Sequence, residues 1–313
     1  MTLCEKEPLL HVEGLKQHFR ISRSYTTKAV DGISFDIYPG ETYGLVGESG
    51  SGKSTTGRAI IRLYEPTDGK IIFDGHDISH KLNKETERYL RTNMQMIFQD
   101  PMACLNPRKK VKEIIAQGLE IQHLCKTKEE LDEKVYAILD KVGLSKEQAL
   151  RYPQQFSGGQ RQRIGIARAL VMNPKLVIAD EAISALDVSI QAQVVNLMKD
   201  LQEELGTTYL FIAHDLSMVK YISDRIGVMH LGHIVETGTT DEIFSHPIHP
   251  YTKSLLSAIP HPDPHLEKHR TALQYDKDAE GVDYTKGIIH QVTETHSVLA
   301  TDGEYRKWTK ESD

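Results

Sequence analysis

A phosphate-binding loop is predicted at residues 47–55, where the sequence GESGSGKST matches the pattern G-x-x-x-x-G-K-[ST] at every fixed position. Glycines carry no side chain, so successive backbone N–H groups can curl around an anion, and the next helix directs its positive end at the same point. Residues 42–46 before the loop predict a strand, and residues 55–64 after it predict a helix. This order of strand, loop and helix predicts an α/β nucleotide-binding core.

The loop assigns roles to individual residues. Lys53 is expected to meet the outer phosphates, and Ser54 offers a hydroxyl to Mg²⁺, which bridges two phosphates and neutralises charge as a phosphoryl group transfers. The residues predicted to bind the nucleotide here are Gly47, Glu48, Ser49, Gly50, Ser51, Gly52, Lys53, Ser54 and Thr55. A chance glycine turn ahead of a helix is the alternative, and the preceding strand argues against it.

Length and composition exclude several classes of protein. A chain of 313 residues suggests about two structural units. It contains no apolar run of about 18 residues, and the charged start at 1–8 is expected to be cytosolic. A net charge of -6 argues against broad nucleic-acid binding, so no nucleic-acid partner is expected. Cys4, Cys104 and Cys125 lack metal-ligand spacing and are predicted to be reduced thiols.

Hydrophobic periodicity divides the chain. Alternating residues at 9–19 and 29–37, and a strand at 70–73 after a turn, predict an N-terminal antiparallel sheet. An apolar strand at 94–98 ends at Pro101, and helical spacing then predicts a helical insertion over about 101–155. With the start of the next helix, the helical subdomain is assigned to about 101–165.

The following segment alternates strands and helices. Apolar strands at 176–179 and 208–213 flank a helix that Gly206 is expected to close, which predicts a mostly parallel sheet with ligand groups at the carboxyl ends of its strands. Short strands return after residue 226. Prolines then crowd the chain and predict little regular structure up to Asp313. The domains are therefore assigned to 1–240, the nucleotide-binding domain, and to 241–313, a C-terminal extension.

Two acidic residues follow a predicted buried strand, at the end that is expected to lie next to the nucleotide. Asp180 is expected to hold Mg²⁺, directly or through water, and Glu181 points elsewhere and is free to take a proton from the attacking water. Acidic residues at a strand end are also common on surfaces. The intact phosphate loop upstream favours the catalytic interpretation.

A second anion-binding site, called a cradle below, is predicted at the start of a helix. Its residues are Ser157, Gly158, Gly159 and Gln160, which offer backbone N–H groups, a hydroxyl and the positive end of a helix. One nucleotide seldom needs two such cradles in one subunit, so this cradle is expected to serve a nucleotide held by a neighbouring subunit. By itself, Ser-Gly-Gly could equally be a linker turn.

Taken together, these motifs resemble the ATP-binding subunits of ABC transporters over nearly the whole chain. The matching stretches, in family order and spacing, are 47–55, Gln99, 156–160, 176–181, 184–187 and His214. The sequences FQDP at 98–101, SALDVSIQAQ at 184–193, HPYT at 249–252 and LLSAIP at 255–260 resemble the oligopeptide and dipeptide importer branch. The residues beyond Pro264 are most similar to the F-type ATPase subunit of Gram-positive oligopeptide permeases.

The resemblance implies the remaining site residues. Gln99 would sense the γ-phosphate and Mg²⁺ while coupling to the membrane subunit, although it could be an ordinary strand-end glutamine. His214 would hold the γ-phosphate and orient Glu181, and Asp187 would shape the dimer contact near the attacking water. Tyr25 is expected to stack on adenine, with Phe19 as its rival.

The resemblance also implies an assembly. Two ATP molecules would lie between this subunit and a homologous, different ATPase subunit, and two integral-membrane permease subunits would import peptides from an extracytoplasmic binding protein. The chain would then be peripheral, at the cytoplasmic face of the cell membrane. Three alternatives stay open: an importer of another solute such as nickel or a glycoside, a non-transport ABC ATPase, and a non-hydrolysing interaction subunit.

The chain departs from the family pattern at two positions. Ala182 replaces the usual proline after the catalytic glutamate, which should loosen that turn, and Phe156 replaces a leucine. No cysteine follows Cys125, so no iron–sulfur cluster is expected. A metal site is also not expected from the tail histidines, since prolines keep them off a shared helical face; these are His246, His249, His261, His265 and His269.

Overall fold

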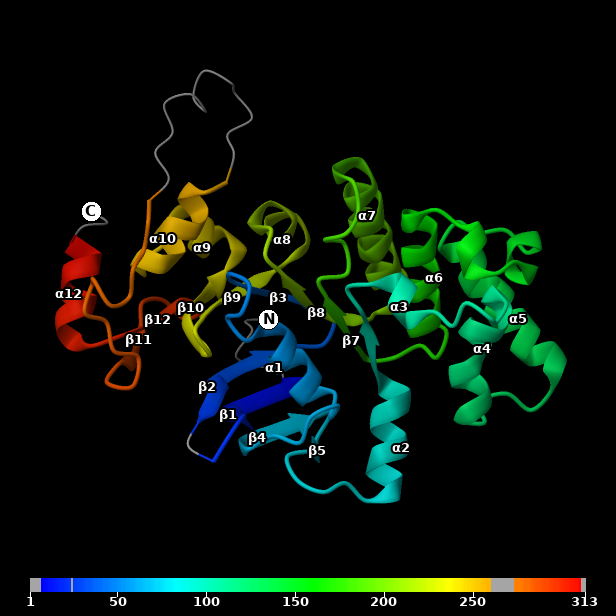
Figure 1. Cartoon of the computed structure of the whole chain (residues 1–313), viewed down its shortest axis with the longest axis horizontal. Coiled ribbons are helices and arrows are strands. Elements are labelled where there is room, and N and C mark those ends of the chain that lie inside the picture. Colours follow the sequence, from blue (N-terminus) through cyan, green and yellow to red (C-terminus); the bar gives the residue numbers. More distant parts are fainter. Residues whose placement is uncertain (1–6, 24, 260–272, 311–313) are drawn as a thin grey trace.

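The computed structural model describes residues 7–23, 25–259 and 273–310. Its centre is an eight-stranded sheet in the order β11-β12-β10-β9-β3-β8-β7-β6 (Figure 1). The five strands from β9 to β6 are parallel, as predicted, and the three at the other edge pair antiparallel. The strands are β3 (Thr42–Val46), β6 (Met94–Ile97), β7 (Leu176–Asp180), β8 (Thr208–Ala213), β9 (Arg225–His230), β10 (His233–Thr239), β11 (Ile288–Gln291) and β12 (Ser297–Ala300).

A second, smaller sheet confirms the antiparallel prediction for the N-terminal part. Its order is β2-β1-β4-β5, and every pairing within it is antiparallel. The strands are β1 (Leu10–Arg20), β2 (Thr26–Ile37), β4 (Asp68–Phe73) and β5 (His76–Asp77). The helix after the phosphate loop, α1 (Lys53–Ile60), ends before the predicted residue 64, because Arg62 adopts a left-handed backbone with φ of 63°. Helix α2 (Lys84–Asn93), capped by the Asn83 side chain, was not predicted.

The buried central strands face two hydrophobic cores. On β8, Leu210 and Ile212 pack into a core shared with the small sheet and α1, whereas Phe211 faces the other core. This alternation follows from the two-residue period of a strand. Fully burying a side chain such as Leu210 contributes about 1.5–3 kcal/mol, so the two cores together fix the orientation of the strand ends that carry the site.

A mainly helical region lies at one end of the molecule, to the right in Figure 1. It contains α3 (Pro101–Cys104), α4 (Val111–Ile121), α5 (Lys128–Lys141), the short 3₁₀ helices η2 (Glu147–Leu150) and η3 (Pro153–Gln155), and α6 (Gly158–Leu170). Helices α7 (Val188–Leu205) and α8 (Leu216–Ile222) follow β7 and β8. Gly206 ends α7 with φ of 68°, which confirms the predicted left-handed cap.

The C-terminal segment is more regular than the sequence predicted. It forms α9 (Thr240–Ser245), α10 (Pro250–Ser257) and α12 (Asp302–Lys310), and β12 pairs with β10 in the main sheet. The expectation of little regular structure was therefore wrong for the described part of this segment. Among the described residues, no helix has both the length and the apolar character needed to cross a lipid bilayer.

Candidate functional site

The phosphate loop runs from the end of β3 to α1, and main-chain atoms surround two of its glycines. A Cβ on Gly47 would lie 2.1 Å from the carbonyl oxygen of Met229, and a Cβ on Gly52 would lie 2.2 Å from that of Ala29. Both glycines also have positive φ, 152° and 107°. Only glycine meets these conditions, which explains the spacing of the motif. Gly52 is the N-cap of α1 and contributes no side-chain cap, so the polar end of α1 suits an anion.

The ammonium of Lys53 is buried beneath the loop. The residue is 3% exposed, and its Nζ donates hydrogen bonds to the carbonyl oxygens of Gly47 and Glu48, both at 2.7 Å. Burial lowers the pKa of Lys53, while the charges of Glu181, Asp180 and Glu48 act in the opposite direction. The positive charge of Lys53 therefore lies inside the loop, where it could neutralise the charge of a bound phosphate group.

Asp180 lies beside the first turn of α1. It is 1% exposed at the end of β7, and its Oδ1 accepts a hydrogen bond from Ser54 Oγ at 2.6 Å. Arg58, which the sequence did not single out, lies 3.3 Å from the other carboxylate oxygen. A carboxylate and a hydroxyl at this distance are the oxygen ligands that Mg²⁺ prefers, so Ser54 and Asp180 fit the group.

Glu181 stands at the mouth of the loop between two predicted partners. Gln99 Nε2 donates a hydrogen bond to Glu181 Oε2 at 2.7 Å, and His214 Nδ1 lies 3.8 Å from the same oxygen. The backbone of Glu181 has φ of 47°, an uncommon conformation for a residue with a side chain. Gln99, Glu181 and His214 follow the ends of the neighbouring strands β6, β7 and β8 by one or two residues, which is why the sheet brings them together.

A pocket of about 250 Å³ joins these elements. It is lined by Ala29, Ser49, Gly50, Gly52, Lys53, Ser54, Thr55, Gln99 and Glu181. Most of the predicted phosphate-binding residues and two of the three predicted catalytic residues therefore share one cavity. Their roles toward a nucleotide stay predictions.

The turn after Glu181 is held without the proline of the family pattern. Glu181 N–H donates to the carbonyl oxygen of Ile212 at 2.9 Å, and Ser184 Oγ donates to the carbonyl oxygen of Glu181 at 3.0 Å. Ala182 itself is buried, at 2% exposure. The expected loosening is thus opposed by hydrogen bonds on both sides of the turn.

The second predicted cradle lies outside that pocket. Ser157 caps α6 as part of a capping box: its hydroxyl accepts from Gln160 N–H at 3.4 Å, and Gln160 Oε1 accepts from Ser157 N–H at 3.1 Å. Ser157 and Gly158 are exposed, and Gly159 is half-buried. Asp187, the N-cap of α7, is exposed as well. These residues therefore face outward, as a contact with another subunit requires.

The two candidates for adenine stacking differ in exposure. Tyr25 is 61% exposed, whereas the ring of Phe19 packs edge-to-face on Tyr64 at 5.3 Å between centroids. A free aromatic face is what a base can stack on, so exposure favours Tyr25. Its role stays a prediction.

The tail histidines differ from one another. His246 is exposed, whereas His249 is fully buried and its Nδ1 accepts a hydrogen bond from Tyr251 N–H at 3.0 Å. Positions 261, 265 and 269 lie outside the described residues. Within the described part of the chain, no group of three His, Cys, Asp or Glu residues has the arrangement of a metal site.

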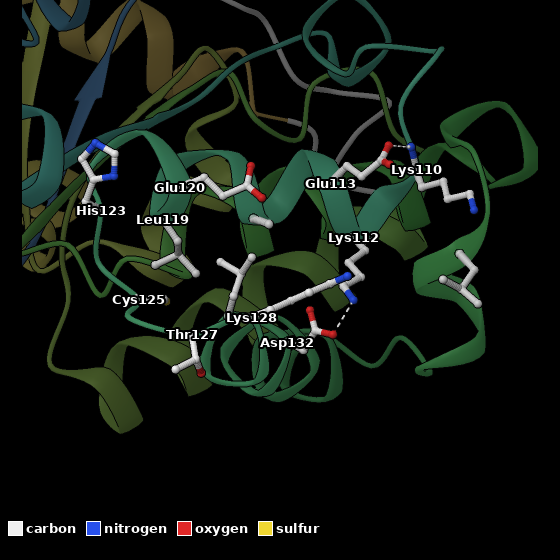
Figure 2. A pocket seen from close by; sticks show the side chains of 13 residues that line it. Lys110, Lys112, Glu113, Leu119, Glu120, His123, Cys125, Thr127, Lys128 and Asp132 are labelled. Atoms are coloured by element: carbon white, nitrogen blue, oxygen red, sulfur yellow. Dashed lines mark hydrogen bonds and ion pairs between the residues drawn. The ribbon is translucent and has the colours of Figure 1, made fainter.

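A separate hollow of about 500 Å³ lies between α4 and α5 (Figure 2). The Lys112–Asp132 ion pair, at 2.6 Å, links the two helices across it, and Leu119 and Leu131 give it an apolar wall. None of the predicted nucleotide-site residues lines this hollow.

Comparison with known proteins agrees with this geometry. Residues 30–184 match the family model "ABC transporter", and residues 235–286 match the model "Oligopeptide/dipeptide transporter, C-terminal region". The oligopeptide transport ATP-binding protein OppF of Bacillus subtilis (strain 168) is 58% identical over 97% of this chain and 99% of the relative. The dipeptide transport ATP-binding protein DppF of Lactococcus lactis subsp. cremoris is 54% identical over 98% and 99%.

Solved structures share the fold. CbiO1 from Clostridium perfringens, part of an ABC transporter complex, superposes with a TM-score of 0.68 at 29% identity, covering 77% of this chain and 92% of that one. The cassette MJ0796, solved as a dimer bound to ADP and Pi, gives 0.67 at 27% identity, covering 74% and 98%. The chain therefore belongs to the ATP-hydrolysing subunits of ABC transporters, in the branch of the oligopeptide and dipeptide transporters.

Proposed function

We propose that this chain hydrolyses ATP at the phosphate loop and that Glu181 is the general base. The observation that carries the proposal is the contact of the Glu181 carboxylate with both Gln99 and His214 beside the loop of Lys53. A carboxylate held in this way can accept the proton of an attacking water, and the neighbouring amide and imidazole fix its orientation. His214 would contact the γ-phosphate.

Ser54, Asp180 and Gln99 would hold Mg²⁺. The ion supplies charge neutralisation for the two outer phosphates of ATP. The chain's own part is to present the Ser54 hydroxyl and the buried Asp180 carboxylate on the same side of the loop, at 2.6 Å from each other. Arg58 offsets part of the carboxylate charge when no cation is bound.

We further propose that the complete site needs two subunits. The exposed cradle at Ser157 and Gly159 would close over ATP bound to Lys53 of a homologous ATPase subunit, and the cradle of that subunit would close over Lys53 here. Support comes from the outward orientation of Ser157 and from the dimeric form of the related cassette. Residues 1–240 would act as the ATP-binding unit, and 241–313 as its extension.

The energy of this cycle would drive peptide import. ATP binding would close the two ATPase subunits and hydrolysis would reopen them, so that two integral-membrane subunits alternate access for peptides from an extracytoplasmic binding protein. The chain would work at the cytoplasmic face of the membrane. Gln99 directly precedes Asp100, the N-cap of α3, so a shift at the nucleotide could reach the helical region and a membrane subunit docked on it.

Peptide uptake tests the proposal. Cells carry either the wild-type chain or Glu181→Gln as the only copy, and the uptake of labelled oligopeptides is measured. Because the amide cannot accept the proton, ATP hydrolysis should fall by about 10²–10⁴-fold and uptake should be lost, with ATP binding retained. Glu203→Gln, at an exposed position of α7, is the matched control and should leave uptake unchanged.

Two outcomes contradict the proposal. If ATP hydrolysis by the Glu181→Gln variant equals that of the wild type, Glu181 is not the base. If the wild type hydrolyses ATP but takes up no peptide, the solute is a different one, and a panel of metal ions and glycosides identifies it.

A further inference from the structure

A tyrosine of the C-terminal segment contacts the phosphate loop. Glu48 N–H donates a hydrogen bond to Tyr251 Oη at 2.9 Å, and the two residues are 203 positions apart in the sequence. Glu48 directly follows Gly47, the first glycine of the motif. The segment beyond residue 240 thus touches the backbone of the loop that holds Lys53.

One peptide unit of the loop is held at both ends. Its N–H, from Glu48, is bonded to Tyr251, and its carbonyl oxygen, from Gly47, accepts a hydrogen bond from Lys53 Nζ at 2.7 Å. Because the peptide bond is planar, a tilt of the N–H changes the direction of the carbonyl. The orientation imposed by Tyr251 therefore reaches the ammonium that is expected to meet phosphate.

Tyr251 itself is rigidly packed. It is 1% exposed, and the ring of His230 stacks on it with 4.1 Å between centroids. His230 Nδ1 is in turn 2.5 Å from the hydroxyl of Tyr284. Burial lowers the pKa of His230 to about 4, so this ring is neutral near pH 7 and brings no charge into the stack.

The start of α10, which carries Tyr251, is tied to the main sheet. The buried carboxylate of Glu236 on β10 accepts hydrogen bonds from Ile248 N–H at 2.8 Å and His249 N–H at 3.1 Å, and it lies 2.8 Å from His296 Nε2. The ring of His249 packs against Trp308 of α12 at 4.8 Å. The position of the Tyr251 hydroxyl thus depends on β10, on the residues before β12 and on α12.

We propose that Tyr251 is a positioning residue of the nucleotide site, through which the C-terminal segment sets the affinity of the phosphate loop for ATP and ADP. The proposal rests on the proposed binding of ATP at Lys53. Tyr251 acts through the Gly47–Glu48 peptide and does not itself touch the nucleotide.

Tyr251→Phe tests the proposal, because it removes the hydroxyl and keeps the packed ring. We expect dissociation constants for ATP and ADP about three- to tenfold higher, the effect of losing one hydrogen bond. Amide hydrogen exchange across residues 47–53 of the nucleotide-free chain should become faster. Tyr221→Phe is the matched control: it removes a hydroxyl that donates a hydrogen bond to Asn196 Oδ1 on α7 and not to the phosphate loop, so affinity and exchange at 47–53 should stay within twofold of wild type.

Unchanged nucleotide affinity together with unchanged exchange at 47–53 in Tyr251→Phe overturns the proposal. If wild-type chain binds no ATP, the proposed site itself is wrong, which is a different result. Should Tyr251→Phe not fold, Trp308→Phe replaces it, since that change keeps the Tyr251 side chain but loosens the packing of α12 on α10 that positions it. Faster exchange at 47–53 in that variant supports the proposal, and unchanged exchange contradicts it.

Discussion

Helices α1 and α6 both begin at glycine-rich sequences that predict anion binding, yet their N-termini differ. Gly52 caps α1 without a side chain, and the buried Lys53 and Asp180 lie beside it. Ser157 caps α6 through a reciprocal bond with Gln160 and is exposed. The first terminus has donors, a cation and a carboxylate inside one chain. The second terminus is stabilised by its own capping box and is exposed, which suits a nucleotide held by a different subunit.

The largest effect should come from a glycine of the first terminus. Gly52→Ala places a Cβ 2.2 Å from the Ala29 carbonyl oxygen at a φ of 107°, so the loop must distort. We expect the free energy of unfolding to fall by about 2–4 kcal/mol and ATP affinity to fall by about 100-fold or more. Chemical denaturation and nucleotide titration measure the two quantities.

Gly158→Ala is the matched control from the second terminus. A Cβ there would be 3.6 Å from Leu186 Cδ2, an ordinary contact, so stability and ATP affinity of the isolated chain should change little. If Gly52→Ala and Gly158→Ala lost equal amounts of stability and ATP affinity, the two glycines would be under the same constraint, and the two helix termini would not differ as described.

An effect of intermediate size is expected when the hydroxyl proposed to bind Mg²⁺ is removed from the first terminus. Ser54→Ala removes the hydroxyl beside Asp180, so ATP affinity in the presence of Mg²⁺ should fall by about tenfold. With Mg²⁺ chelated, the variant and the wild type should bind ATP equally. A tenfold loss that persists after chelation would mean that Ser54 acts on the loop and not on the ion.

The smallest effect should come from the cap of α6. Ser157→Ala leaves Gln160 N–H without its side-chain acceptor, which costs about 1 kcal/mol and lowers the thermal midpoint by about 2–4 °C. Ser157→Asn, which keeps a capping acceptor, should melt like the wild type. A Ser157→Ala chain that melts at the wild-type temperature would show that the capping box contributes nothing.

The sequence predicted the site more fully than the C-terminal segment. The proximity of motif residues that follow strands, such as Gln99, Glu181 and His214, could be predicted because parallel strands end at one edge of a sheet. Strands β11 and β12 have only four residues each, which is too short for a two-residue period to be recognised in the sequence.

Contacts between residues far apart in the chain could not be predicted from the sequence. The bond of Tyr251 to Glu48 spans 203 positions, and the Arg58–Asp180 pair spans 122. Neither follows from local propensity, because each depends on how helices pack on the sheet. The motif HPYT marked Tyr251 as part of a family pattern without indicating what it touches.

We propose that the two cradles serve nucleotides held by different subunits. It is tested most directly by ATP binding to the isolated chain, compared among wild type, Lys53→Ala and Ser157→Arg. We expect Lys53→Ala to weaken binding by about 100-fold or more, and Ser157→Arg to bind ATP like the wild type and to fail only in hydrolysis by the assembled transporter. If Ser157→Arg weakens ATP binding to the isolated chain as strongly as Lys53→Ala, both cradles act on one nucleotide and the claim is wrong.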